Sequence, residues 1–64
     1  MIINGKNMEF DNGINIMELL KKFNLSEDKV VVELNYEIIP KEKFSQIVLN
    51  KEDKLEIVSF VGGG

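Results

Sequence analysis

A single amphipathic helix set among short strand patterns is the feature that most limits what this chain can fold into. Asn15 followed three residues later by Glu18 is a capping-box pattern, which predicts a helix that begins at Ile16. The apolar residues recur with the period of one buried helical stripe: Ile16, Leu19, Leu20 and Phe23. With 64 residues the chain is long enough for one small domain. This helix must therefore cover one face of whatever sheet the strands form.

The N-terminal residues predict a β-hairpin. Residues 1–3 and 6–10 flank Asn4-Gly5, the dipeptide best suited to a type I′ turn because both central positions need positive φ angles. Strand alternation then places four apolar residues on the face toward the core: Met1, Ile3, Met8 and Phe10.

The second half of the chain contains two further strand patterns before an irregular segment. Residues 30–34 are rich in β-branched side chains and predict a central strand, which a tight reversal follows. Residues 37–39 predict a short strand that ends at Pro40, because proline lacks the N–H that a strand interior needs. Residues 41–50 show neither strand alternation nor a full helical stripe, apart from one helical turn expected near Phe44.

The last strand is predicted over residues 54–60, where apolar and polar residues alternate again. Leu55 and Ile57 belong to one face, and Val58 and Phe60 point to the other. Because no second helix is predicted to cover that other face, Val58 and Phe60 form a candidate docking patch for a partner. The alternative is that the strand twists and Phe60 folds back into the core.

The chain ends in three glycines that cannot serve to stabilise a fold. Glycine loses the most backbone freedom on ordering and adds no side-chain contact. We therefore divide the chain into a domain over residues 1–60 and a flexible tail over residues 61–64. Gly62 and Gly63 make this tail narrow enough to carry the Gly64 carboxylate into a slot on another protein. The alternative is an incidental frayed end.

The composition leaves little room for chemistry within the domain itself. The chain has no Cys and no His, so it lacks a thiol nucleophile, thiolate ligands and the commonest general base. We expect no catalytic residue, no metal site and no stably bound cofactor. A net charge of −3 argues against nucleic acid as a partner, and no apolar stretch is long enough to cross a membrane. We expect a cytoplasmic protein.

The element order predicts an α+β fold of the ubiquitin-like β-grasp type, with a mixed sheet of four to five strands and one main helix packed on one face. The whole chain also resembles the ThiS family of bacterial thiamin sulfur carriers, within the ubiquitin-like sulfur-carrier class. The resemblance is carried by the helix opening at residues 14–20, Leu34-Asn35, Ile38-Ile39-Pro40-Lys41, Phe44, Asp53 and the terminal Gly63-Gly64.

This resemblance implies a carrier protein rather than an enzyme. In the family, an ATP- and Mg²⁺-using adenylyltransferase of the ThiF type converts the terminal carboxylate, here that of Gly64, to an acyl-adenylate. Sulfur derived from cysteine then displaces AMP and leaves a thiocarboxylate. A thiazole synthase of the ThiG type receives that sulfur for the thiazole of thiamin. Gly64 is thus the expected modified residue, and Gly62 and Gly63 are expected to give partner active sites access to it.

Three other functions fit the same residues. The activated tail is suited to carry sulfur for molybdopterin synthesis, and it is also suited to join lysine amines as a ubiquitin-like protein modifier. A passive β-grasp interaction module with incidental glycines is the third. The identity of the acceptor enzyme separates the two carriers, and an isopeptide bond from Gly64 to lysine identifies a modifier. A passive module would keep its partner binding after deletion of Gly63 and Gly64.

Overall fold

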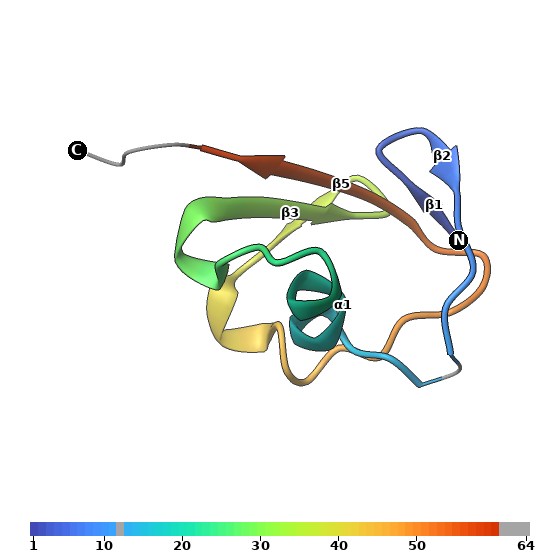
Figure 1. Cartoon of the computed structure of the whole chain (residues 1–64), viewed down its shortest axis with the longest axis horizontal. Helices are drawn as coiled ribbons and strands as arrows, with labels where there is room; N and C mark the ends of the chain where they lie inside the picture. The colour runs from blue at the N-terminus through green and yellow to red at the C-terminus, as the bar shows by residue number, and fades with distance from the viewer. Residues whose placement is uncertain (12, 61–64) are drawn as a thin grey trace.

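The structure, a computed structural model, describes residues 1–11 and 13–60. Within these residues the chain forms one α-helix and five β-strands, which Figure 1 shows in chain order. The chain also forms two single-turn 3₁₀ helices: Glu27–Lys29 lies between the α-helix and the third strand, and Lys41–Lys43 lies between the fourth and fifth strands. The elements are β1 (Ile2–Ile3), β2 (Lys6–Asn7), α1 (Ile16–Lys22), β3 (Val30–Leu34), β4 (Glu37–Ile39) and β5 (Lys54–Ser59).

The strands of the described residues form a single mixed sheet in the order β2-β1-β5-β3-β4. β5 lies in the middle, parallel to β1 and antiparallel to β3, and both hairpins are antiparallel. In Figure 1 helix α1 lies against one face of this sheet. This arrangement agrees with the predicted α+β fold, in which one main helix packs on one face of a mixed sheet.

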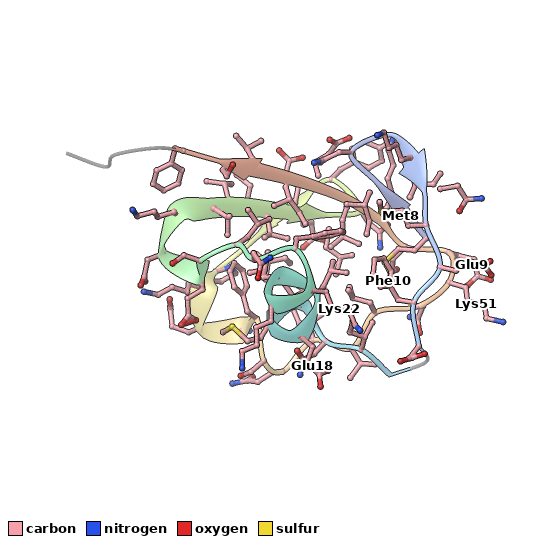
Figure 2. The ribbon with its side chains drawn as sticks, viewed as in Figure 1. Met8, Glu9, Phe10, Glu18, Lys22 and Lys51 are labelled. Atoms are coloured by element: carbon pink, nitrogen blue, oxygen red, sulfur yellow. The ribbon has the colours of Figure 1, made fainter. Side chains whose placement is uncertain are left out.

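The β1–β2 hairpin has the predicted type I′ turn. Asn4 and Gly5 both have positive φ angles, of 50° and 83°, and Ile3 pairs with Lys6. The second strand is shorter than predicted, because regular pairing stops at Asn7 instead of continuing to residue 10. Met8 and Phe10 are half-buried and still pack against the core. Figure 2 shows both on the side of the sheet that faces the helix.

Helix α1 begins as predicted, with both halves of the capping box formed. The Glu18 amide donates to the Asn15 side-chain oxygen at 2.7 Å, and the Asn15 amide donates to the Glu18 carboxylate at 2.9 Å. The helix ends where Asn24 adopts a φ of 57° and the Leu25 amide donates to the Leu20 carbonyl. That left-handed residue and its flanking hydrogen bond close the last turn.

The segment over residues 41–50 completes the helix N-terminus. The first amides of a helix have no partner within it. Here the Ile16 amide donates to the Ile47 carbonyl at 3.2 Å, and the Met17 amide donates to the Phe44 carbonyl at 3.1 Å. The expected helical turn is a 3₁₀ turn at Lys41–Lys43, and it places Phe44 in the core with 1% of its surface exposed.

The hydrophobic core lies between the sheet and the helix. Its side chains come from the helix and the residues just before it, from the helix-facing side of β1, β3 and β5, and from residues 41–50. The buried apolar residues are Ile3, Ile14, Ile16, Leu19, Leu20, Val30, Val32, Phe44, Leu49, Leu55 and Ile57. The residues that the structure describes place no element over the opposite side of the sheet, so we call that side the uncovered face (Figure 1).

Candidate functional site

The predicted docking-patch residues, Val58 and Phe60, are both exposed at the end of β5. Leu55 and Ile57 are buried beneath the sheet, whereas Val58 and Phe60 have 61% and 45% of their surfaces exposed. The Phe60 amide donates to the Lys29 carbonyl at 2.9 Å, which keeps the chain in register one residue beyond the strand. Phe60 therefore does not fold back into the core, and the patch lies where the chain leaves the sheet.

The uncovered face carries more apolar surface than sequence reasoning identified. Val31 on β3 pairs directly with Val58, and Ile38 on β4 pairs with Glu33 of β3. Both apolar side chains are exposed, Ile38 by 69%. The signal for Val31 was present in the alternation of residues 30–34, but its position beside Val58 depends on the β3–β5 register.

Acidic and basic residues follow the apolar row on the same face. Glu33 of β3 lies directly opposite Glu56 of β5. Two residues before Glu56, Lys54 donates to the Tyr36 hydroxyl at 3.0 Å and lies 5.0 Å from the centre of the Tyr36 ring. The hydrogen bond to the Tyr36 hydroxyl raises the pKa of Lys54 above its usual value. The uncovered face is thus apolar beside residue 60 and carries charged side chains toward the start of β5, where the exposed Ile2 of β1 pairs with Lys54.

The β3–β4 turn holds Tyr36 in place. Asn35 and Tyr36 have φ angles of 50° and 72°, the left-handed region that bulky residues rarely adopt. The Asn35 side chain accepts from the Lys54 amide and donates to Asp53 Oδ1, both at 3.0 Å. These bonds attach the turn to the beginning of β5, so the edge hairpin and the central strand are fixed to each other.

The predicted modification residue Gly64, and the access residues Gly62 and Gly63, lie outside the described residues. What the structure describes is the strand that leads to them. β5 lies between β1 and β3 in the sheet: β1 pairs with Lys54 and Leu55 at its start, and β3 pairs with residues 55–59. The strand ends at Ser59, directly before Phe60. The chain therefore leaves the sheet from a strand that is paired with β3 up to Ser59, and Phe60, the last described residue, is still hydrogen-bonded to the Lys29 carbonyl.

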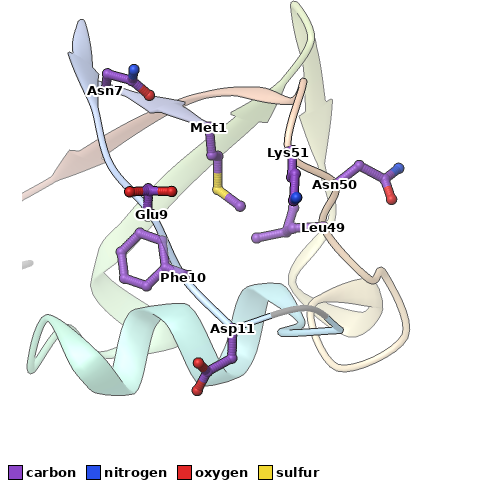
Figure 3. Close-up of a pocket in the computed structure, with 8 residues that line it drawn as sticks. All are labelled: Met1, Asn7, Glu9, Phe10, Asp11, Leu49, Asn50 and Lys51. Carbon is purple, nitrogen blue, oxygen red and sulfur yellow. The ribbon is translucent and has the colours of Figure 1, made fainter.

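A hollow of 260 Å³ lies at the other end of the domain, between the segment after β2 and the loop before β5 (Figure 3). Its charged residues are Glu9, Asp11 and Lys51. In Figure 3 Asp11 lies at the helix end of the hollow, apart from Glu9 and Lys51. We assign it no chemistry, because these groups do not converge on one point.

Within residues 1–11 and 13–60, no group of three or more acidic, His or Cys side chains is arranged to hold a metal ion. No helix among these residues is long and apolar enough to cross a membrane. Their one ion pair joins Lys41 to Asp28 at 2.6 Å on the surface. This hydrogen bond and the Asp28 charge raise the pKa of Lys41.

A mixed five-stranded sheet with one helix on one face, in the described part of the chain, defines a protein of the ubiquitin-like β-grasp class. Two solved structures of a thiamine biosynthesis protein from Geobacter metallireducens agree. The crystal structure, described as ThiS, has a TM-score of 0.77 at 30% identity and aligns over 98% of this chain and 96% of that one. The solution structure has a TM-score of 0.78. The predicted fold is confirmed.

The chain belongs to the ThiS family, whose sequence model matches residues 1–64. The sulfur carrier protein ThiS of Bacillus subtilis is 44% identical over 64 residues, which cover 97% of this chain and 96% of the relative. A thiazole synthase from Paramagnetospirillum magneticum is 42% identical over 64 residues, which cover the whole of this chain and 20% of that protein. The predicted family is therefore confirmed.

Proposed function

We propose that this chain is the sulfur carrier for the thiazole of thiamin, with the Gly64 carboxylate as the carrying group. The observation that supports it is the course of β5. This strand lies between β1 and β3 in the sheet and leads, through Phe60 and Val61, to Gly62-Gly63-Gly64 in the sequence. Membership of the ThiS family, which consists of carriers rather than enzymes, favours the same function.

The chemistry takes place at the tail and requires partner enzymes. A carboxylate is a poor acyl electrophile, so one oxygen of Gly64 first attacks the α-phosphate of ATP and releases pyrophosphate. Hydrosulfide, with its sulfur derived from cysteine, then attacks the carbonyl carbon and forms the C–S bond, the bond to AMP breaks, and a thiocarboxylate remains. An adenylyltransferase of the ThiF type holds the ATP and Mg²⁺. Glycine at positions 63 and 64 leaves room for both reactants, because any Cβ would narrow their approach.

Thiazole synthase of the ThiG type is the acceptor that we propose for the sulfur. Two relatives named thiazole synthase, from Paramagnetospirillum magneticum and Magnetococcus marinus, contain a stretch similar to this chain, which spans only about a fifth of their length. A carrier-like stretch within a thiazole synthase favours a functional connection between the two. That connection also favours the thiazole of thiamin over molybdopterin as the destination.

The docking patch, Val58 and Phe60, gives these partners a surface beside the tail. Apolar side chains exposed on a small domain mark interaction sites when they adjoin one another. Val31 lies opposite Val58 and extends the patch across β3. A partner that binds this patch is positioned to receive the tail. Carriers must also be released between enzymes, so we expect modest interfaces.

Intact-protein mass spectrometry tests the proposal. The chain is incubated with its host's adenylyltransferase, ATP, Mg²⁺ and a cysteine-derived sulfur source, and the site of any mass change is located by fragmentation. Replacement of one oxygen by sulfur at Gly64 is the expected result. An unmodified terminus, under conditions that load a known carrier, would refute it. Isopeptide bonds from Gly64 to lysines would instead identify a protein modifier.

A further inference from the structure

Two glutamates occupy directly opposite positions on neighbouring strands of the uncovered face. Glu33 on β3 and Glu56 on β5 are direct partners in the antiparallel register. Side chains in such positions have Cβ atoms about 4.5–5.5 Å apart, and like charges placed there destabilise a sheet. Glu33 is also half-buried, which strengthens the repulsion by lowering the local dielectric constant. The pair is therefore expected to destabilise the free domain.

No cation within the described residues forms an ion pair with Glu33 or Glu56. The one ion pair there joins Lys41 to Asp28. Lys54 precedes Glu56 by two residues on the same face of β5. The pKa of Lys54 is raised chiefly by the hydrogen bond to Tyr36, and the charge of Glu56 contributes to this raised pKa as well. The ammonium group of Lys54 is nevertheless hydrogen-bonded to the Tyr36 hydroxyl and lies over the Tyr36 ring. The two carboxylates therefore remain available to an external cation.

Apolar side chains surround the acidic pair. Val31 and Val58 form the neighbouring cross-strand row on the side of residue 60, and Ile38 lies beside Glu33 on β4. All three are exposed. A flat, weakly hydrated guanidinium fits such a place better than an ammonium, because it bonds two carboxylates in one plane and tolerates apolar neighbours. The face is complementary to an arginine set among apolar side chains.

We propose that the uncovered face binds the adenylyltransferase through an arginine of that enzyme seated on Glu33 and Glu56, with Val31, Val58 and Ile38 covered around it. This inference rests on the proposed function. Adenylation brings a carboxylate to a triphosphate, so the enzyme must surround this reaction with positive charge. A positive approach surface is complementary to this acidic pair and to a chain with a net charge of −3.

A second copy of the chain is a poor occupant of the same face. A two-fold symmetric contact places the same patch on both sides of the interface. It would bring the two acidic pairs together at its centre, where four carboxylates would repel one another. The charge of the face thus favours a different protein.

Titration calorimetry of the full chain with its host's adenylyltransferase, at low and high salt, tests the inference. Glu33→Gln and Glu56→Gln keep shape and remove charge, and Glu52→Gln makes the same charge change in the exposed loop before β5. We expect each face variant to bind about tenfold more weakly, with a smaller salt dependence, and the loop variant to bind like the wild type. The melting temperature of each face variant should rise, because the repulsion is gone.

The opposite signs of the two effects identify a binding role, since a merely solvated pair would change stability and leave affinity alone. If the wild-type chain is adenylated and both face variants bind as tightly as it does, this inference is wrong and the proposed function stands. If the adenylyltransferase neither binds nor adenylates the wild-type chain, both the inference and the proposed function are wrong.

Discussion

Asn4 and Ile57, 53 residues apart in the chain, are joined by two hydrogen bonds through the Asn4 side chain. Its amide nitrogen donates to the Ile57 carbonyl at 3.1 Å, and its oxygen accepts from the Ile57 amide at 2.7 Å. Asn4 is a turn residue, so its side chain continues the pairing of β1 with β5 beyond the point where the β1 backbone turns away. A residue suited to the turn also connects the first hairpin to the central strand.

Asn4→Gly should therefore destabilise the domain although glycine suits the turn. Asn7→Gly is the matched control, because Asn7 is exposed on the edge strand β2. The substitution of glycine there adds a comparable loss of backbone conformational entropy on folding. We expect Asn4→Gly to lower the free energy of unfolding by about 1 kcal/mol more than the control does. Urea denaturation measures both. Equal losses in the two variants would show that the Asn4 bonds contribute nothing.

The surface pair of Lys41 and Asp28 should contribute to stability at neutral pH and cease to do so in strong alkali. The pKa of Lys41 is raised in the fold, so its contribution is complete below the ordinary value of 10.5 and disappears as the pH rises through the higher folded value. Lys41→Gln should melt slightly lower than the wild type at pH 7 and equally at strongly alkaline pH. Lys43→Gln is the control, because Lys43 is an exposed lysine two residues away. A difference that persists in strong alkali would contradict this assignment.

Val58→Ser should weaken binding to the adenylyltransferase and leave the domain folded. Val58 has 61% of its surface exposed, so the substitution opens no cavity in the core. Val48→Ser is the matched control, since Val48 is also exposed, by 55%, but belongs to the segment that packs on the helix N-terminus. We expect the dissociation constant to be about five- to twentyfold larger for Val58→Ser and unchanged for Val48→Ser. Similar affinities for both variants would place the docking surface elsewhere.

Gly63→Val should block sulfur loading without unfolding the domain. A branched Cβ at position 63 restricts the backbone and narrows the approach to the Gly64 carboxylate. Ser59→Val, at the exposed end of β5, adds the same side chain before the tail and should load like the wild type. Mass spectrometry measures the loading of both variants, and circular dichroism checks their fold. Normal loading of Gly63→Val would overturn the proposed role of the tail.

Local signals made much of the fold predictable. Asn4-Gly5 specified its turn because few other residues accept two positive φ angles in succession. Asn15 and Glu18 specified the start of the helix because the side chain of each accepts a hydrogen bond from the backbone amide of the other. The alternation in β5 likewise predicted that Val58 and Phe60 would be exposed.

The parts that escaped prediction depend on partners far apart in the chain. Residues 41–50 have no period of their own because their carbonyls serve Ile16 and Met17, about thirty residues earlier. The acidic pair of Glu33 and Glu56 becomes visible only when the β3–β5 register is known. Tyr36 has a left-handed backbone although it is bulky, and bonds from Asn35 to the start of β5 hold that turn.

The position of β5 has a consequence for when the domain can exist during synthesis. β5 follows all the other described strands in the chain, yet it is the strand that connects the β1–β2 hairpin to the β3–β4 hairpin. Isolated two-stranded hairpins are at best marginally stable in water. A nascent chain that has not yet released residues 54–59 from the ribosome therefore holds two unconnected hairpins. The completed sheet, and with it the uncovered face, forms only after translation has passed the strand that leads to the glycines.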